Sequence, residues 1–359
     1  MIIGFIGLHN SGKSTIFSAL TDIESDISPF PSQLSEPHLG VVEVEDERIN
    51  KLAEIYHPSK TIKATVEFMD FAGLGEDQNN KAVFPAPALA KIKTADALAF
   101  VIRNFQDPIL NDSLGQPSPV KDIENILSEL IISDLIITEN RLGKISLSKK
   151  RGIKEQSLVL EEQTLLKIQE QLNTNKPIRE LGLTADEEKS VRGFQFLTLK
   201  PAFIILNSDE NNYGQNKSMI VKLESDHKII EFAGKFELEL NNLIPEDRKI
   251  FMEDIGIIES AKDRLIHFSY SILGYISFFT VGSDEVRAWT LSDGQTALEA
   301  AGKIHTDLQR GFIRAECFNY DQLIEFGSEK ELKHHGLFRL EGKNYQVRDG
   351  DILTIRFNI

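Results

Sequence analysis

Short runs of apolar residues, separated by longer stretches with helical periodicity, mark the first three quarters of the chain. Runs of this kind, bounded by turn residues and lacking a polar alternation, are typical of strands that are buried on both faces of a sheet. We therefore predict an α/β fold in which a mostly parallel sheet is covered by helices on both sides. The expected strands are residues 2–6, 64–70, 96–103, 201–207 and 228–232.

Between the third and fourth of these strands, apolar residues recur at steps of three and four within residues 122–199. This period is typical of helices, and Gly152 separates two such stretches. We therefore predict an antiparallel helical hairpin with its tip near residues 143–155. The apolar positions expected to form its seam are Ile123, Ile126, Leu127, Leu130, Ile131, Leu135, Ile136, Leu142, Leu158, Leu165, Leu166, Ile168 and Leu172.

The pattern changes again at about residue 277. Two strands, one amphipathic helix and further short strands are expected there, which indicates a small α+β domain of the β-grasp type. The strands are residues 277–281, 285–291, 314–318 and 351–357, and the helix is residues 296–309. The expected parts of the chain are a sheet domain of residues 1–121 and 200–276, an inserted helical arm of residues 122–199, and a β-grasp domain of residues 277–359.

A phosphate-binding loop follows the first expected strand and precedes a helix expected over residues 14–21. The residues Gly7-Leu8-His9-Asn10-Ser11-Gly12-Lys13-Ser14 fit the pattern GxxxxGK[ST]. The two glycines permit a tight loop whose backbone N–H groups face the phosphates. Lys13 is expected to bind the β- and γ-phosphates and to act in catalysis, and the Ser14 hydroxyl to ligate Mg²⁺. The predicted nucleotide-binding residues of this loop are Asn10, Ser11, Gly12, Lys13, Ser14 and Thr15.

The second expected strand ends in Asp70-Phe71-Ala72-Gly73. A carboxylate at this place can hold Mg²⁺ through water, so Asp70 is a predicted metal ligand. Gly73 lets its amide approach the γ-phosphate, and we predict a catalytic role for it. Aspartate and glycine are common at strand ends, so this pattern gains its meaning from the phosphate loop that precedes it.

The fourth expected strand ends in Asn207-Ser208-Asp209-Glu210, where a nucleotide-binding domain of this type binds the base. GTPases usually have Asn-Lys-x-Asp here, and the aspartate accepts hydrogen bonds from guanine. Ser208 replaces the lysine and the longer Glu210 replaces the aspartate, which should pair poorly with guanine. The alternative is a polar strand exit without a ligand. The predicted base-side residues are Asn207, Ser208 and Glu210, with Ala233, Gly234 and Lys235 after the fifth strand.

The chain is acidic, with 40 lysine and arginine residues against 55 aspartate and glutamate residues and a net charge of −15. This balance disfavours a protein that coats DNA. The one concentrated basic stretch, residues 141–154, lies at the expected arm tip and contains no acidic residue. Lys149, Lys150 and Arg151 are candidate contacts to RNA phosphates, and the alternative is a solvated hairpin end.

The compartment is indicated by what the sequence lacks. No apolar run approaches the roughly 20 residues that span a bilayer, and the apolar N-terminus has no basic segment before it. The single cysteine, Cys317, cannot form an intrachain disulfide. We therefore expect a cytoplasmic protein without a membrane partner.

Over essentially its whole length, the chain resembles the YchF subfamily of Obg-like P-loop ATPases. Besides the three motifs above, the resemblance rests on more specific C-terminal segments at residues 278–280, 285–290, 301–307, 310–316 and 349–351. It implies a G domain interrupted by a helical arm and followed by a TGS domain. It also implies that the protein prefers ATP to GTP, hydrolyses it slowly and associates with ribosomes.

Around the expected position of the γ-phosphate, one residue shared with the family differs from Ras-like GTPases, and two segments depart from the family itself. Leu74 stands where Ras-like GTPases place a water-orienting glutamine, and residues 75–87 replace a glycine-rich segment with bulkier residues and two prolines. Residues 28–37 lack the family's Mg²⁺-ligating threonine, for which Ser32 or Ser35 is the candidate substitute. The resemblance therefore supports nucleotide binding more strongly than efficient turnover.

These observations predict a translation-associated ATPase switch. MgATP would order segments near residues 28–40 and 74–90, and the arm and the C-terminal domain would transmit that state to a ribosome. Two alternatives are a nucleotide-binding scaffold with little hydrolysis, which the altered segments favour, and a conventional GTPase, which Glu210 disfavours.

Overall fold

The computed structural model describes residues 2–21, 23, 38–71, 75–76, 82–83, 86–151, 156–254 and 260–358. Contacts between residues divide the chain into two compact units. The first contains residues 1–40 and 67–262, and the second contains residues 41–66 and 263–359.

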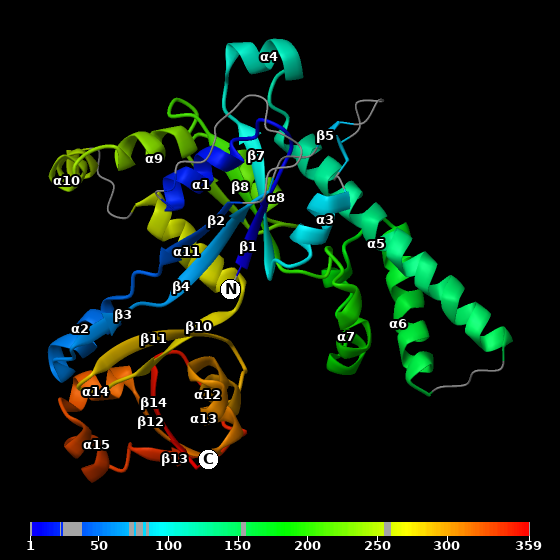
Figure 1. The fold of residues 1–359 in the computed structure, drawn as a ribbon. Helices are drawn as coiled ribbons and strands as arrows, with labels where there is room; N and C mark the ends of the chain where they lie inside the picture. Colours follow the sequence, from blue (N-terminus) through cyan, green and yellow to red (C-terminus); the bar gives the residue numbers. More distant parts are fainter. Residues whose placement is uncertain are drawn as a thin grey trace. The chain divides into compact units, whose positions relative to one another are not determined.

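The first unit is built on a sheet with the strand order β2-β4-β1-β7-β8-β9 (Figure 1). β1 pairs in parallel with β4 and β7, and β8 pairs in parallel with β7 and β9. All of β7 and nearly all of β8 are buried, which explains their almost continuous apolar sequences. The strands are β1 (Ile2–Ile6), β2 (His38–Glu43), β4 (Thr65–Asp70), β7 (Ala97–Asn104), β8 (Ala202–Ser208) and β9 (Ile229–Phe232).

Helices cover both faces of this sheet. On one face, Ile126 and Leu130 of α5 share an apolar cluster with Phe100 and Ile204 of the central strands, and α3 and α8 pack against the same cluster. On the other face α1 lies beside α9. The first unit also contains a short hairpin of β5 (Gly75–Glu76) and β6 (Ala82–Val83). The helices are α1 (Lys13–Thr21), α3 (Ala86–Ile92), α4 (Pro108–Leu114), α8 (Lys217–Leu223), α9 (Gly234–Asn241) and α10 (Pro245–Asp254).

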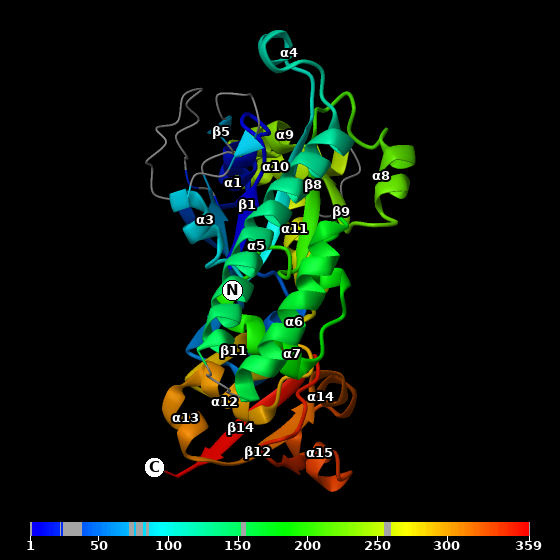
Figure 2. The same ribbon diagram turned by 90° about the vertical axis from the view of Figure 1, so that its right-hand side faces the viewer.

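The inserted helices form the expected antiparallel hairpin, with α5 (Pro119–Lys150) and α6 (Gln156–Asn173) side by side in both views (Figures 1 and 2). α7 (Ala185–Val191) packs on α6. Two expected seam positions are wrong: Ile136 is 54% exposed and Leu166 is 51% exposed. On each helix, the apolar stripe predicted from the sequence was wider than the face that the other helix of the hairpin covers. α5 also extends further than expected, as far as Lys150, into the range predicted for the tip.

One buried carboxylate of the arm holds the segment that precedes β8. Asp134 of α5 is fully buried and accepts hydrogen bonds from the backbone N–H groups of Leu197 (3.0 Å) and Thr198 (2.8 Å). It also accepts one from the Thr198 hydroxyl at 2.7 Å. Burial raises the pKa of Asp134, and these hydrogen bonds oppose the rise. The segment that leads from the arm into β8 is thereby fixed against α5.

The second unit has a mixed sheet with the strand order β13-β12-β14-β10-β11-β3. β10 pairs with β11 as an antiparallel hairpin and with β14 in parallel, and α12 packs over this sheet, as in a β-grasp fold. The helix expected over residues 296–309 is broken, because His305 has an extended backbone and caps α13. The elements are α11 (Ala261–Ile272), β10 (Tyr275–Thr280), β11 (Glu285–Ser292), α12 (Ala297–Ile304), α13 (Thr306–Arg310), β12 (Phe312–Asn319), α14 (Tyr320–Phe326), α15 (Glu329–His334), β13 (Arg339–Glu341) and β14 (Asp351–Phe357).

A segment from the N-terminal part of the chain completes this second sheet. β3 (Lys60–Ile62) pairs in parallel with β11, and α2 (Glu47–Tyr56) packs beside it. Arg48 of α2 donates to the Asp349 carboxylate at 2.6 Å, and the Tyr56 hydroxyl donates to Glu329 at 2.8 Å. The grouping of the chain by contacts thus does not follow the expected boundary at residue 277. The predicted fold class itself is confirmed, with its parallel sheet, its helical hairpin and its C-terminal β-grasp sheet.

Candidate functional site

The phosphate loop connects β1 to α1 and leaves no room for side chains at its two glycines. A Cβ atom on Gly7 would lie 2.4 Å from the carbonyl oxygen of Val101, and one on Gly12 would lie 2.1 Å from Nδ2 of Asn207. Gly12 also has a φ of +91°, which favours glycine, and Asn10 has a positive φ of 57°. The loop leads directly into α1. The first backbone N–H groups of this helix have no acceptor within the helix, so they can face a phosphate.

Lys13 begins α1, and its side chain turns back across the loop. The side chain is buried, with 6% of the residue exposed, and Nζ donates to the carbonyl oxygens of Leu8 (2.8 Å) and Gly7 (3.2 Å). Burial lowers the pKa of Lys13 to about 8, and the nearby Asp70 carboxylate opposes that fall. At neutral pH a buried positive charge therefore lies inside the phosphate loop.

Ser14 and Asp70 form the second polar pair of the site. The Ser14 hydroxyl donates to Oδ2 of Asp70 at 2.7 Å, although the two residues are far apart in the sequence. Burial raises the pKa of Asp70, while Lys13 and the Ser14 hydrogen bond oppose that rise. Oδ1 of Asp70 and Oγ of Ser11 are buried and make no hydrogen bond with any residue that the structure describes. Unpaired buried oxygens of this kind are costly without a ligand, ion or water.

Asn207 joins the phosphate loop to the base side of the site. Its Nδ2 donates to the carbonyl oxygen of Ser11 at 3.0 Å, and its Oδ1 accepts from the backbone N–H of Gly234 at 3.1 Å. Gly234 is buried at the start of α9, and a Cβ there would lie 3.0 Å from Oδ1 of Asn207. One amide side chain thus holds three segments of the chain together.

Ser208 belongs to a polar network that the sequence did not reveal. Its hydroxyl donates to Oε1 of Glu231 at 2.6 Å and accepts from Nδ2 of Asn104 at 2.9 Å. Asn216 Nδ2 also donates to Oε1 of Glu231 (2.6 Å), and the Gly214 N–H donates to Oε2 (3.0 Å). Glu231 therefore fixes the loop that follows β8. Its only trace in the sequence was a charged residue placed between the apolar residues Ile230 and Phe232.

The two acidic residues after Ser208 have different environments. Asp209 accepts hydrogen bonds from the backbone N–H groups of Gln106 (2.9 Å) and Asn212 (3.0 Å), so both of its oxygens are engaged. Glu210 is exposed. Of the two carboxylates, the one that remains available on this side is that of Glu210.

The structure brings most of the predicted residues together. Thr15 lies in the first turn of α1, and Ala233 is buried beside Gly234. Lys235 is exposed on α9. Gly73, the second predicted catalytic residue, lies outside the described residues, as do the candidate substitutes Ser32 and Ser35.

The basic residues at the arm tip are not part of this cluster. Lys149 forms an ion pair with Glu162 of α6, and Arg141 forms one with Glu161. Lys150 and Arg151 are exposed at the end of α5. Two cations of the basic stretch are therefore balanced by carboxylates of the returning helix, a pairing that the count of basic residues did not show.

The fold and the site together define a class of protein. A parallel sheet, a GxxxxGKS loop between β1 and α1, and a carboxylate at the end of the adjacent β4 are the features of a P-loop nucleoside triphosphatase. Residues 2–141 match the family model described as "50S ribosome-binding GTPase". Residues 275–358 match the model for the C-terminal region of YchF GTPases, which is described as "Protein of unknown function".

The chain belongs to the YchF family. It is 37% identical over 363 residues to the "Ribosome-binding ATPase YchF" of Bacillus subtilis (strain 168), and 36% identical over 360 residues to the protein of the same name from Escherichia coli O157:H7. In both comparisons 99% of each chain is covered. The solved structure of the Schizosaccharomyces pombe YchF GTPase matches with a TM-score of 0.83 and 26% identity, covering 99% of this chain and 97% of that one. The family resemblance seen in the sequence is confirmed.

Within the part of the chain that the structure describes, no helix combines the length and the apolar character that a membrane span needs.

Proposed function

We propose that this protein is a Mg²⁺-dependent ATPase that acts on ribosomes and hydrolyses ATP slowly. The proposal of nucleotide binding and hydrolysis rests on the buried Lys13 ammonium beside the Ser14–Asp70 pair. The ribosomal part rests on the names of the relatives, which are ribosome-binding ATPases. A ribosomal partner would place the protein in the cytoplasm.

Ser14 and Asp70 are the proposed Mg²⁺ site. Hydroxyl and carboxylate oxygens are the ligand types that Mg²⁺ prefers, and P-loop proteins use this pair directly or through water. The buried and unpaired Oδ1 of Asp70 fits this role, because it needs a partner that the described residues do not supply. When bound, Mg²⁺ supplies positive charge to the β- and γ-phosphates.

The residues on the base side support the proposed preference for ATP over GTP. A guanine-specific site needs a carboxylate that accepts from two neighbouring N–H groups of the base. Backbone N–H groups donate to both oxygens of Asp209 and hold its carboxylate in place, so this side chain is committed to the protein's own backbone. Ser208 is held by Glu231, so no long side chain covers the base from this position. The remaining carboxylate, Glu210, is longer by one methylene than the aspartate of GTPases.

Slow turnover is proposed from the same site. Lys13 would exchange its loop carbonyl partners for phosphate oxygens and stabilise the charge that develops during phosphoryl transfer. Leu74 stands where Ras-like GTPases have a glutamine that orients the attacking water. Its apolar side chain cannot orient a water molecule, so this catalytic contribution is lost. The same observation favours a second candidate function, a nucleotide-binding scaffold that uses ATP only as a ligand.

A nucleotide titration tests the base preference. Isothermal titration calorimetry of the wild-type protein with ADP and GDP should show that ADP binds about tenfold more tightly, or better. The reason is that each polar group of guanine that is buried without a hydrogen-bond partner costs about 1–3 kcal/mol of binding free energy. Glu210→Asp should reduce the ratio between the two affinities. Glu239→Asp, an exposed position on α9, is the matched control and should leave the ratio unchanged. Tighter binding of GDP by the wild type would overturn the ATP assignment.

Single-turnover hydrolysis separates the ATPase from the scaffold. We expect labelled ATP to be hydrolysed slowly by the protein alone and faster with ribosomes. If ATP stays intact over many hours with and without ribosomes while ADP binding is normal, the scaffold function is the correct one.

A further inference from the structure

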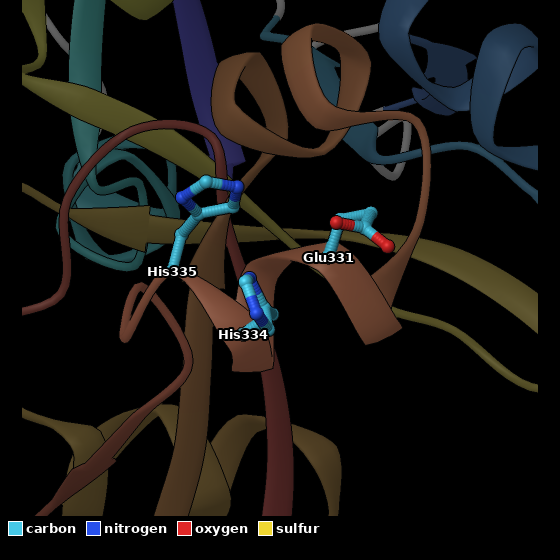
Figure 3. A group of neighbouring side chains, drawn as sticks. All are labelled: Glu331, His334 and His335. Carbon is cyan, nitrogen blue, oxygen red and sulfur yellow. The ribbon is translucent and has the colours of Figure 1, made fainter.

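A cluster of three metal-ligating side chains lies at the end of α15 in the second unit, away from the residues of the nucleotide site in the sequence. One donor atom from each of Glu331, His334 and His335 lies within 4.8 Å of the other two. Figure 3 shows the three side chains projecting from one short helical segment, with His334 between the other two in this view. All three residues are exposed.

The spacing of these residues puts them on one helical face. Positions i, i+3 and i+4 are neighbours on an α-helix, which is why histidines at such spacing can share a metal ion. His335 follows the last residue of α15, but its φ of −88° and ψ of 4° keep it close to the helical path. Its backbone N–H donates to the carbonyl oxygen of Glu331 at 2.9 Å, which fixes the i to i+4 distance.

The backbone beneath the cluster is held at both ends. Ser328 caps the N-terminus of α15 through its hydroxyl and the N–H of Glu331 at 3.3 Å. Gly336, with a φ of +68°, ends the helix, and the following N–H of Leu337 donates to the carbonyl oxygen of Leu332 at 2.9 Å. Leu332 is fully buried and anchors the neighbouring face of the helix. The three donors therefore stand on a fixed support.

Neighbouring groups leave the donors accessible. The His335 ring lies against Phe326, with 4.7 Å between the ring centroids, and this contact restricts its orientation. The Lys333 ammonium lies over the ring of Phe338 at 4.4 Å and within 3.7 Å of Glu329, so it does not neutralise Glu331.

We propose that Glu331, His334 and His335 form a surface site for a divalent transition-metal ion of the Zn²⁺ type. Two imidazoles and one carboxylate are a donor set that Zn²⁺ accepts and that Mg²⁺ and Ca²⁺ do not favour. Small rotations of exposed side chains can bring the donors to the metal. Three protein donors leave a fourth tetrahedral position open to water or to a donor from a binding partner.

Calorimetric titration with ZnCl₂ tests this site. The protein should be the full chain without a histidine tag, in excess Mg²⁺ and ADP so that the nucleotide site is saturated. We expect one Zn²⁺ per chain, with binding weakened by at least about tenfold in His334→Ala and in Glu331→Gln, since loss of even an outer-shell partner costs that much. His305→Asn removes an exposed histidine outside the cluster while keeping a helix-capping side chain, and it should bind Zn²⁺ like the wild type.

The outcomes are distinct. Zn²⁺ should raise the melting temperature of the wild type and of His305→Asn but not that of His334→Ala. Such a result would support the site, because an ion that binds only the folded protein stabilises it by mass action. Absence of Zn²⁺ binding by the wild type would overturn it. So would unchanged affinity in both His334→Ala and Glu331→Gln, or displacement of Zn²⁺ by equimolar Ca²⁺, which would indicate an unspecific acidic surface.

Discussion

The phosphate loop and the arm tip are both rich in groups that suit phosphate, yet the structure gives them different characters. Lys13 is buried, bonded to carbonyl oxygens of its own loop, and has its pKa lowered to about 8. Lys149 is half exposed and paired with Glu162 of the facing helix. A buried cation with fixed partners contributes strongly to binding, whereas an exposed ion pair is screened by water and salt. A lysine side chain therefore contributes to phosphate binding to a degree that depends on its burial and on its partners.

The largest effect is expected at Lys13. Replacement by alanine removes the buried ammonium from the phosphate loop, and the loss of charge-assisted hydrogen bonds should weaken MgATP binding by about 3 kcal/mol or more, roughly 100-fold. Lys149→Ala at the arm tip is the control, with an unchanged affinity for nucleotide. Equal affinities of the two variants in a fluorescent-nucleotide titration would remove the distinction between the two regions.

The next effect concerns the support of the phosphate loop. Asn207→Ala should lower the free energy of unfolding by about 2–4 kcal/mol, because it leaves the Ser11 carbonyl and the Gly234 N–H without their partner in a buried place. Urea denaturation measures this change. Asn211→Ala, at an exposed position in the next loop, should change the stability by less than about 0.5 kcal/mol. Similar losses in the two variants would contradict the bridging role of Asn207.

The lowered pKa of Lys13 gives the site a pH dependence with two opposite signs. As the pH rises above about 8, folded Lys13 loses its proton, so affinity for ATP should fall by up to tenfold per pH unit. Between about 8 and the ordinary value of 10.5, the unfolded chain holds more protons than the folded one. The contribution of Lys13 to stability therefore rises over the same range.

Titrations of affinity and of urea stability at several pH values measure both trends. Lys13→Arg keeps its charge at these pH values, so its ATP affinity, although lower, should not change over this range. A wild-type affinity that stays constant up to pH 10 would show that the Lys13 ammonium is not the phosphate-binding charge.

The smallest effect is expected at the arm tip. Lys150→Glu with Arg151→Glu should reduce co-sedimentation with ribosomes a few-fold and make its salt dependence shallower by roughly one to two units of slope, as expected when one or two phosphate contacts are lost. Lys149 is left unchanged because its partner Glu162 would then face a like charge. Lys176→Glu with Lys189→Glu changes the net charge equally at other exposed positions and should bind like the wild type. Equal loss in both double variants would assign the effect to total charge.

The predictions that succeeded without the structure rest on local patterns. β1, the phosphate loop and α1 follow one another within a single short segment, so spacing alone identified them. The buried strands and the helical hairpin carried long periodic patterns. Exposed Ile136 and Leu166 were misjudged because periodicity gives the apolar stripe of a helix and not the width that its partner covers.

The sequence by itself determined the α/β class, the nucleotide loop and the family, because each depends on residue types at fixed short spacing. The tertiary structure alone decided which distant groups pair. Asp134 is paired with Thr198, Ser208 with Glu231, and β3 with β11. Buried polar groups and the edges of strands need hydrogen-bond partners, and these pairings supply them. Any partner that the fold brings close can do so, whatever its distance along the chain. A strand of three residues such as Lys60–Ile62 has no recognisable pattern until its neighbour is known.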